Sequence, residues 1–329
     1  MSRMNRTCLI YALAPEARCS PRNPRPDGYL ALSNDILIRY LECDVCEAFQ
    51  NTDNSAEKFT SLYDKEFDLI IIATEFNPLS EEDLETIYKF VCNGGSLLIL
   101  HDAGADGLLC TNTNMLSEKF GMKFNGDFFG CDGSCRDNFI SLDKYYEKSS
   151  SMVENDSKFG SMCNELYKLY PPDSWKKRFI VENDCIGKIV YWGCSLVCCE
   201  NADLQLKGDT YHKSLEQNPF KGKKYVPIAF NDKGRYLSNP VILAGRDIGN
   251  GKVVCFGGKF VFENSSLCIE SHIKLFEWIF NWCTKDSNAV KLPKPSLKVR
   301  TKVAYKKHYI IISTFYAFLT IVLGLLAIM

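Results

Sequence analysis

The chain has 329 residues, 46% of them hydrophobic, and its 39 basic and 40 acidic side chains leave a formal charge of −1. This length and apolar content suit a large folded domain, and they exclude a mainly disordered or collagen-like protein. A near-neutral chain also lacks the basic surface typical of nucleic-acid-binding domains, so no nucleic-acid partner is expected.

The N-terminal segment permits two interpretations. Arg3 and Arg6 precede a short apolar run ending in Ala12-Leu13-Ala14, which resembles the core and cleavage site of a signal peptide. The run has only the minimum length for such a core, and Pro15 would directly follow the cut. We therefore favour a buried first strand over residues 7–14. The body of the protein is then expected in the cytosol, with its 16 cysteines mostly reduced.

Strand-like and helix-like segments alternate as far as residue 124. The apolar patterns predict an amphipathic helix at 29–42, strands at 67–73 and 96–100, and a short helix at 115–120 before the run 122–124. The longest of these strands is apolar almost throughout, as in a strand covered on both faces.

A well-marked helix is predicted between the strands at 67–73 and 96–100. Ser80 is a typical N-cap, Asp83 completes a capping box, and Leu79 with Leu84 can form a hydrophobic staple. Apolar residues then recur at helical spacing, and Gly94-Gly95 ends the helix.

The second half of the domain is less regular, because residues 131–235 are polar and rich in loops. Strands are predicted there at 179–181, 188–191 and 195–199.

Strand-like patterns resume with two apolar runs, at 240–244 and 252–256. They flank Gly249-Asn250-Gly251, which predicts a hairpin, and a helix at 269–282 closes the domain. Repeated strand–helix units predict an α/β fold with a doubly wound, mainly parallel sheet. The hairpin is expected to add an antiparallel edge to this sheet.

The C-terminus predicts a transmembrane helix at residues 309–329, which contain no charged side chain. A helix of this length matches a hydrocarbon core of roughly 30 Å. Tyr309 and Tyr316 suit the headgroup region, Gly324 is tolerated in a membrane helix, and the sequence ends at Met329. The alternative, a buried core helix, is less favoured because such a helix rarely lacks a polar face.

Seven of the 39 basic residues lie beyond residue 290 with no acid among them, which leaves 32 against 40, or −8, for residues 1–290. Positive residues beside a span stay on the cytoplasmic side. We therefore expect a domain at 1–284, a basic linker at 285–308, and a single-pass tail anchor. The domain would face the cytosol, on the endoplasmic reticulum or another endomembrane.

Three stretches together resemble the GIFT domain, a relative of the class I glutamine amidotransferase fold. They read NGGSLLILHDAGADG, TNTNMLSEKFGM and NPVILAGRDIGNGKVVCFGGKF. GIFT domains occur in a core subunit of intraflagellar transport complex B, in a membrane-anchored subunit of oligosaccharyltransferase and in bacterial gliding-motility proteins. The second stretch looks most like the intraflagellar-transport subunit. The resemblance covers roughly residues 7–283, implies an amidotransferase-like sheet, and departs from the transport subunit after Trp282.

Amidotransferase chemistry is not expected. A nucleophilic cysteine must sit at a strained strand-to-helix turn, where this chain reads His101-Asp102-Ala103-Gly104-Ala105. Cys110 lies further on and lacks the glycine frame. The family's His and Glu would follow the last strand, where Glu263 is present without a nearby histidine, and His272 belongs to the closing helix. We therefore predict neither an enzyme nor a cofactor.

The loops at the carboxyl ends of the predicted strands present a candidate binding set, since such loops line the crevice of an open α/β sheet. The set is Glu75, Asn77, His101, Asp102, Gly104, Lys259 and Asn264, with Asp106 and the arginines Arg18, Arg22 and Arg25 nearby. GIFT domains have been suggested to bind glycans, so the resemblance implies a carbohydrate-like, peptide or other polar ligand. The alternative is that His101-Asp102 caps the following turn while the arginines are solvated.

Three cysteine clusters are candidate metal sites: Cys43/Cys46, Cys131/Cys135 and Cys194/Cys198/Cys199. None has the paired short spacings typical of structural zinc, so no metal is predicted and buried thiols are favoured.

The sequence thus predicts a non-catalytic, membrane-anchored adaptor or scaffold that binds other proteins. One alternative is a luminal, oligosaccharyltransferase-like accessory subunit, which requires a working signal and occupied glycosylation sequons at Asn5, Asn155 or Asn264. A second alternative is a degenerate hydrolase that uses Cys110 or His101.

Overall fold

The computed structural model describes residues 6–73, 77–126, 179–183, 187–191, 193–198, 204–207, 241–269, 271–285, 289–299 and 302. The predicted anchor, with Tyr309, Tyr316, Gly324 and Met329, lies outside these residues. Within them, no helix is both long enough and apolar enough to cross a membrane.

The described strands form one large sheet and two small ribbons. The large sheet has the order β2-β1-β4-β5-β12-β11-β9-β6, with β10 also paired to β11. Neighbours from β2 to β12 are parallel, and the remaining neighbours are antiparallel. Its strands are β1 (Arg6–Ala12), β2 (Cys43–Phe49), β4 (Leu69–Ala73), β5 (Ser96–Leu100), β6 (Met122–Phe124), β9 (Leu196–Cys198), β10 (Leu204–Lys207), β11 (Val241–Ile248) and β12 (Gly251–Phe256). The ribbons are β13 (Val290–Lys291) with β3 (Glu66–Phe67), and β7 (Phe179–Asn183) with β8 (Gly187–Tyr191).

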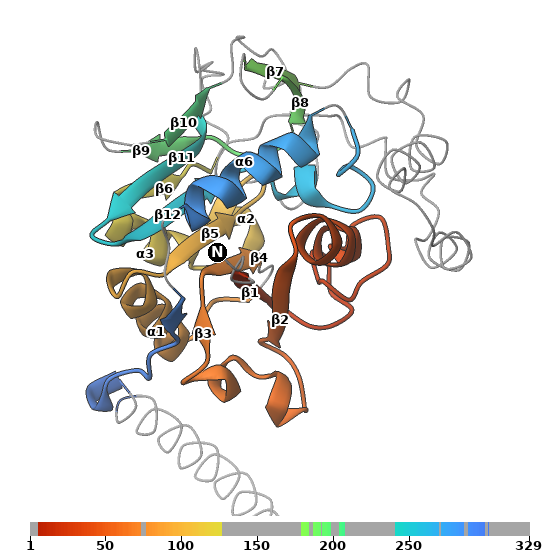
Figure 1. Cartoon of the computed structure of the whole chain (residues 1–329). Coiled ribbons are helices and arrows are strands. Elements are labelled where there is room, and N and C mark those ends of the chain that lie inside the picture. The colour runs from red at the N-terminus through yellow and green to blue at the C-terminus, as the bar shows by residue number, and fades with distance from the viewer. Residues whose placement is uncertain are drawn as a thin grey trace, which may run out of the picture.

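Helices cover both faces of the large sheet (Figure 1). Apolar residues of η1 (Leu32–Tyr40) and α6 (His272–Thr284) join the core on one face. Those of α1 (Glu81–Cys92) and α3 (Thr113–Ser117) join the core on the other. The chain leaves β1 for β2 on one side and then builds β4 and β5 on the other. This arrangement confirms a doubly wound α/β fold, with a mixed, largely parallel sheet.

Short helices complete the described part of the fold. They are η2 (Ser55–Glu57), η3 (Phe59–Leu62), α2 (Ala105–Leu109), η4 (Glu118–Phe120) and η7 (Lys259–Phe262).

The helix predicted from its capping box is confirmed as α1. The Ser80 hydroxyl accepts a 3.0 Å hydrogen bond from the Asp83 amide, and both residues of the expected staple, Leu79 and Leu84, are buried. The helix ends before Gly94, whose φ of +109° suits glycine. The helix expected at 29–42 is also present, as η1, but it is wound as a π-helix. Its last turn closes through a bond from the Leu41 amide to the Ile36 carbonyl.

The hairpin predicted around Gly249-Asn250-Gly251 is confirmed as β11 and β12, but its expected place at the edge of the sheet is wrong. β12 pairs in parallel with β5, and β11 separates β12 from β9 and β6. The hairpin therefore lies inside the sheet. The strands that cover its outer side come partly from the irregular region, whose pairing no local pattern specifies.

The described part of the predicted linker lies against the domain. We call residues 289–299 and 302 the C-terminal strap. It contributes β13, and Leu292 is buried beside α1 with 1% of its surface exposed. The packed domain therefore reaches beyond residue 284.

Candidate functional site

The candidate site lies at what we call the carboxyl edge, the side of the sheet at which β1, β4, β5 and β12 end. Three loops meet there: residues 13–28 after β1, residues 101–104 after β5, and residues 257–264 after β12. Main-chain bonds join them, from the His101 amide to the Phe256 carbonyl (2.9 Å) and from the Lys259 amide to the His101 carbonyl (2.8 Å). The topology thus brings most of the predicted set together.

Four charged residues connect these loops, and we call them the ion cluster: the buried Asp102, Lys259 and Glu263, and the partly exposed Arg18. Arg18 Nη2 lies 2.6 Å from Glu263 Oε1, and Arg18 Nη1 lies 3.2 Å from Asp102 Oδ2. Lys259 Nζ lies 3.8 Å from the same Asp102 oxygen, and its side chain is 0% exposed. Two positive and two negative side chains balance, which offsets the cost of removing each charge from water.

Asn264 holds the first loop in place with every polar atom of its side chain. Its Oδ1 accepts a 2.9 Å bond from the Ala31 amide, and its Nδ2 donates to the carbonyls of Asn23 (3.0 Å) and Arg25 (2.7 Å). Tyr29 adds a bond from its hydroxyl to the Lys259 carbonyl (2.7 Å). In this structure Asn264 therefore fixes loops to each other.

His101 is 2% exposed, and both of its ring nitrogens are engaged. Nδ1 accepts a 2.9 Å bond from the Asp102 amide, so the remaining ring proton lies on Nε2, 3.0 Å from Asp106 Oδ1. Burial opposes ionisation of Asp106, but hydrogen bonds from His101 and Thr111 outweigh it and lower the pKa of Asp106 to about 2. His101 and Asp106 thus form a fixed pair.

The turn after β5 agrees with the capping alternative. Asp102 Oδ1 accepts a 2.8 Å bond from the Ala103 amide, and its carbonyl accepts from Ala105. Gly104 has a φ of +77° and Ala105 one of +45°, an uncommon conformation for a residue with a Cβ. The chain therefore makes a strained strand-to-helix turn like that of a nucleophile elbow, with a methyl side chain at its tip. Cys110 is exposed at the far end of α2.

Two members of the predicted set do not join this group. Glu75 lies outside the described residues. The Asn77 side chain pairs instead with Asn51 Oδ1 at 3.5 Å in an exposed position.

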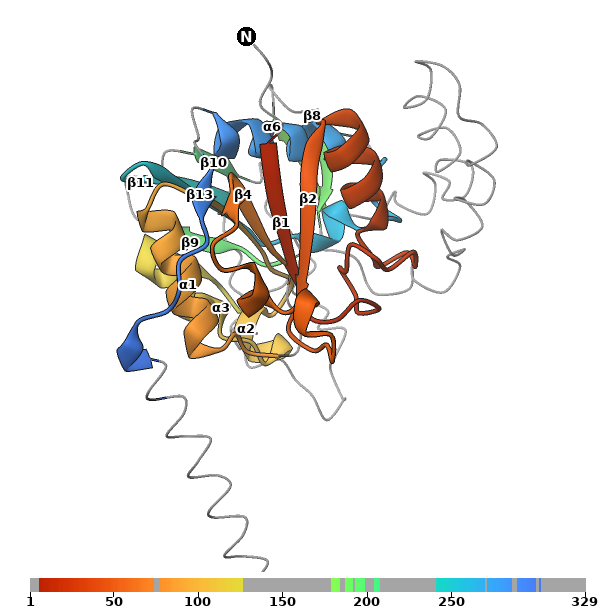
Figure 2. The same ribbon diagram turned by 60° about the horizontal axis from the view of Figure 1, so that its bottom comes forward.

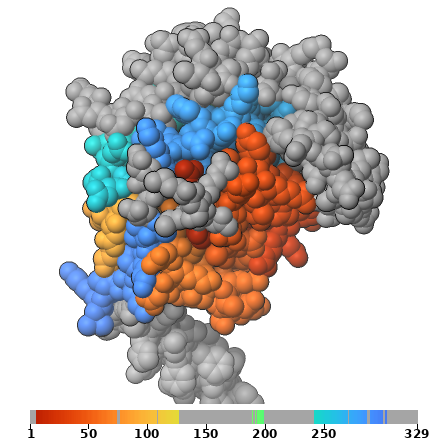
Figure 3. Space-filling view, viewed as in Figure 1, coloured from red at the N-terminus to blue at the C-terminus, as the bar shows by residue number. Residues whose placement is uncertain are grey.

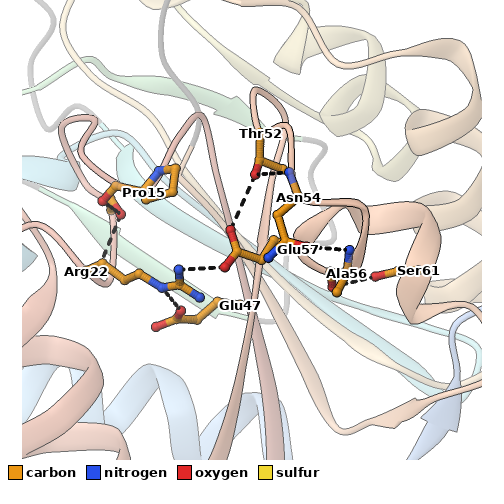
Figure 4. A network of polar contacts seen from close by, with 9 residues as sticks. Pro15, Arg22, Glu47, Thr52, Asn54, Ala56, Glu57 and Ser61 are labelled. Carbon is orange, nitrogen blue, oxygen red and sulfur yellow. Dashed lines mark hydrogen bonds and ion pairs between the residues drawn. The ribbon is translucent and has the colours of Figure 1, made fainter.

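Arg22 belongs to a separate network at the same edge, shown in Figure 4. Its guanidinium lies between the carboxylates of Glu47 (2.6 Å) and Glu57 (2.8 Å) and stacks over Phe49. Arg18 and Arg22 are thus both paired, but only Arg18 is largely removed from solvent: its side chain is 15% exposed, whereas that of Arg22 is 43% exposed.

Glu263 is absent from the binding set predicted from the sequence, where it stands only as a remnant of the catalytic His and Glu. Its place directly after the apolar run at 260–262 was the signal for an inward-facing carboxylate. The partner, Arg18, is far away in the chain, so no local pattern links the two.

The cysteine clusters form no metal site in the described residues, where no three His, Cys, Asp or Glu side chains gather suitably. Cys131, Cys135 and Cys199 lie outside those residues. Cys43 and Cys194 are buried, in agreement with apolar thiols.

We compared this chain with known protein families and with solved structures. Residues 38–174 match the family model described as the IFT52 GIFT domain. The solved structure named mmIFT52 N-terminal domain is 17% identical in sequence and superposes with a TM-score of 0.50. The match covers 86% of this chain and 100% of the mmIFT52 chain. No curated protein matches the sequence.

Two structures of Gan42B, a GH42 β-galactosidase from G. stearothermophilus, are 12% identical, cover 85% of this chain and 30% of their own, and give TM-scores of 0.40 and 0.37. That similarity is too low to carry a shared function. The family match and the fold agree on one similarity: residues 38–174 of this chain are similar to the GIFT domain of IFT52, and the chain shares the fold of the mmIFT52 N-terminal domain.

Proposed function

We propose that this protein is a non-catalytic adaptor, held at a membrane by residues 309–329, whose GIFT domain binds other proteins. The observation that carries the non-catalytic part is the closed carboxyl edge. Open α/β sheets normally carry their ligand-binding and catalytic residues at this edge. In this chain, the edge holds an ion cluster whose members pair with each other, and an alanine stands at the tip of the turn.

The hydrolase alternative would need His101 to activate Cys110. Both nitrogens of His101 already bind partners within the fold, so proton transfer from the thiol would first break one of these bonds. A glutaminase assay on the full chain, with Cys110→Ala as control, tests this. Hydrolysis that the variant loses would contradict the proposal.

A cytosolic domain is supported by the position of β1. Residues 6–12 form an interior strand between β2 and β4, and cleavage after Ala14 would remove that strand. Asn264, one of the three sequons, is 1% exposed and uses its amide in three hydrogen bonds, so the folded domain cannot carry a glycan there.

Protease digestion of intact microsomes tests the topology. The cytosolic proposal predicts that the domain is degraded without detergent and that endoglycosidase leaves its mass unchanged. Protection of the domain, with an endoglycosidase-sensitive mass, would favour the luminal alternative.

The adaptor role rests on the similarity to the IFT52 GIFT domain, and it is tested by capture of partners. We expect tagged full-length protein from solubilised membranes to retain a defined set of proteins, with intraflagellar-transport subunits as the first candidates. Recovery of the protein alone under mild detergent would contradict the adaptor role. A polar or glycan ligand at the carboxyl edge stays a prediction.

A further inference from the structure

The C-terminal strap is bound to the domain by main-chain pairing and by a buried side chain. Val290 and Lys291 pair with Phe67 and Glu66 in the β13–β3 ribbon. The Leu292 amide then donates to the Lys65 carbonyl (2.7 Å), and its side chain enters the core beside α1.

Polar contacts continue this attachment toward residue 302. The amide and hydroxyl of Ser296 both donate to Glu85 Oε2, at 2.7 and 3.1 Å. Lys302 Nζ then lies 2.9 Å from the carboxylate of Glu81. Successive parts of the strap are therefore held by successive turns of α1.

These contacts give the strap a direction. Val290 lies beside Gly94, just past the end of α1, whereas Lys302 pairs with the first residue of that helix. Because α1 starts after the end of β4, the strap leads the chain from the opposite edge of the sheet to the carboxyl edge. Figure 2 shows this path beside α1, and Figure 3 shows strap residues in blue directly against the orange surface that includes β3.

We infer that the strap determines which side of the domain faces a membrane: the carboxyl edge lies toward the lipid headgroups. This rests on the proposed anchor at 309–329. Six residues, 303–308, separate Lys302 from that segment, and six extended residues span about 20 Å at most. The partner of the carboxyl edge is therefore a bilayer surface.

The charges near the end of the strap fit this orientation. The first turn of α1 presents Glu81 and Glu82, which anionic headgroups would repel, whereas the third acid of this turn, Asp83, is buried. Lys302 neutralises the first of these carboxylates, and Lys306 and Lys307 follow before the predicted span. Basic residues close to an anionic surface are attracted to it.

A pair of photo-cross-linking residues tests the orientation in the full-length protein. One replaces Gly107 on α2 at the carboxyl edge, where an added side chain meets no atom within 4 Å. The other replaces Asn250, which is exposed at the hairpin tip on the opposite edge. In vesicles of phosphatidylcholine and phosphatidylserine, we expect several-fold more lipid cross-linking from position 107 than from position 250.

Strap variants complete the test. Leu292→Asp should release the strap and bring the two positions to similar cross-linking, and Glu85→Ala should reduce the difference without disturbing the core.

Flotation of the vesicles measures membrane attachment separately. A chain that does not float contradicts the anchor and, with it, the orientation. A chain that floats with equal labelling, or with stronger labelling at position 250, keeps the anchor and overturns the orientation.

Discussion

The carboxyl edge and the C-terminal strap both depend on ion pairs, but their surroundings differ. In the ion cluster, the side chains of Asp102, Lys259 and Glu263 are at most 6% exposed. In the strap, the side chains of Lys302 and Glu81 are 67% and 42% exposed. Water screens the second pair and not the first, so similar distances correspond to very different energies. The strap is held instead by main-chain pairing and by the buried side chain of Leu292.

The largest expected effect is that of breaking the ion cluster. Glu263→Gln removes the carboxylate 2.6 Å from the largely buried Arg18 guanidinium, which then keeps only its longer, 3.2 Å pair with Asp102. We expect the free energy of unfolding to fall by about 3–5 kcal/mol, measured by urea denaturation. Glu81→Gln, which breaks an exposed pair, is the matched control. Equal losses in the two variants would show that burial does not separate the two regions.

Truncation of the apolar anchor of the strap should come next. Leu292→Ala leaves a cavity beside α1, and we expect a loss of about 2–4 kcal/mol in the free energy of unfolding. Leu297 lies in the same strap but is 81% exposed, so Leu297→Ala should change stability by less than about 0.5 kcal/mol. A neutral Leu292→Ala would mean that the strap is not packed in solution.

The Asp106 pair should respond to pH. Its folded pKa, about 2, lies below the ordinary value of an aspartate. Its contribution is therefore fully present above about pH 4 and is lost as the pH falls toward 2. We expect Asp106→Asn to cost about 2 kcal/mol at pH 6, and the difference from wild type to shrink by pH 2. Urea titrations across this range measure it, and a pH-independent difference would contradict the lowered pKa of Asp106.

The smallest effect should come from the exposed pair of the strap. Lys302→Ala removes the contact with Glu81, for which we expect a loss of about 0.5 kcal/mol or less. Added salt should abolish this difference, because exposed pairs are screened. A loss as large as that of Leu292→Ala would show that the exposed ion pair holds the strap as firmly as its buried side chain does.

The sequence predicted features that depend on neighbouring residues. The capping box at Ser80 and the turn around Asn250 specify local conformation, and both were found where expected. Placing His101, Asp102 and Lys259 at one edge also succeeded, because the rule for strand ends needs only the order of elements.

Features that depend on distant residues were missed. Nothing near Glu263 specifies Arg18 as its partner, and nothing near Gly251 places β12 beside β5. The strap reads as a basic linker because Leu292 is a single buried residue among lysines and prolines. These features are determined by packing between residues that are far apart in the sequence. The residue pattern in a short window carries no information about such contacts.

The position of β12 also sets an order of events during folding. β1, β2, β4 and β5 all come from residues 6–100, so four adjacent strands can assemble from one continuous part of the chain. β5 can pair with β12 only when the long intervening segment has closed into a loop, and the entropy cost of that closure grows with the length of the segment. We therefore expect the join between β5 and β12 to form late and slowly. Until it forms, β5 is an open strand edge that a chaperone would have to cover in the cell.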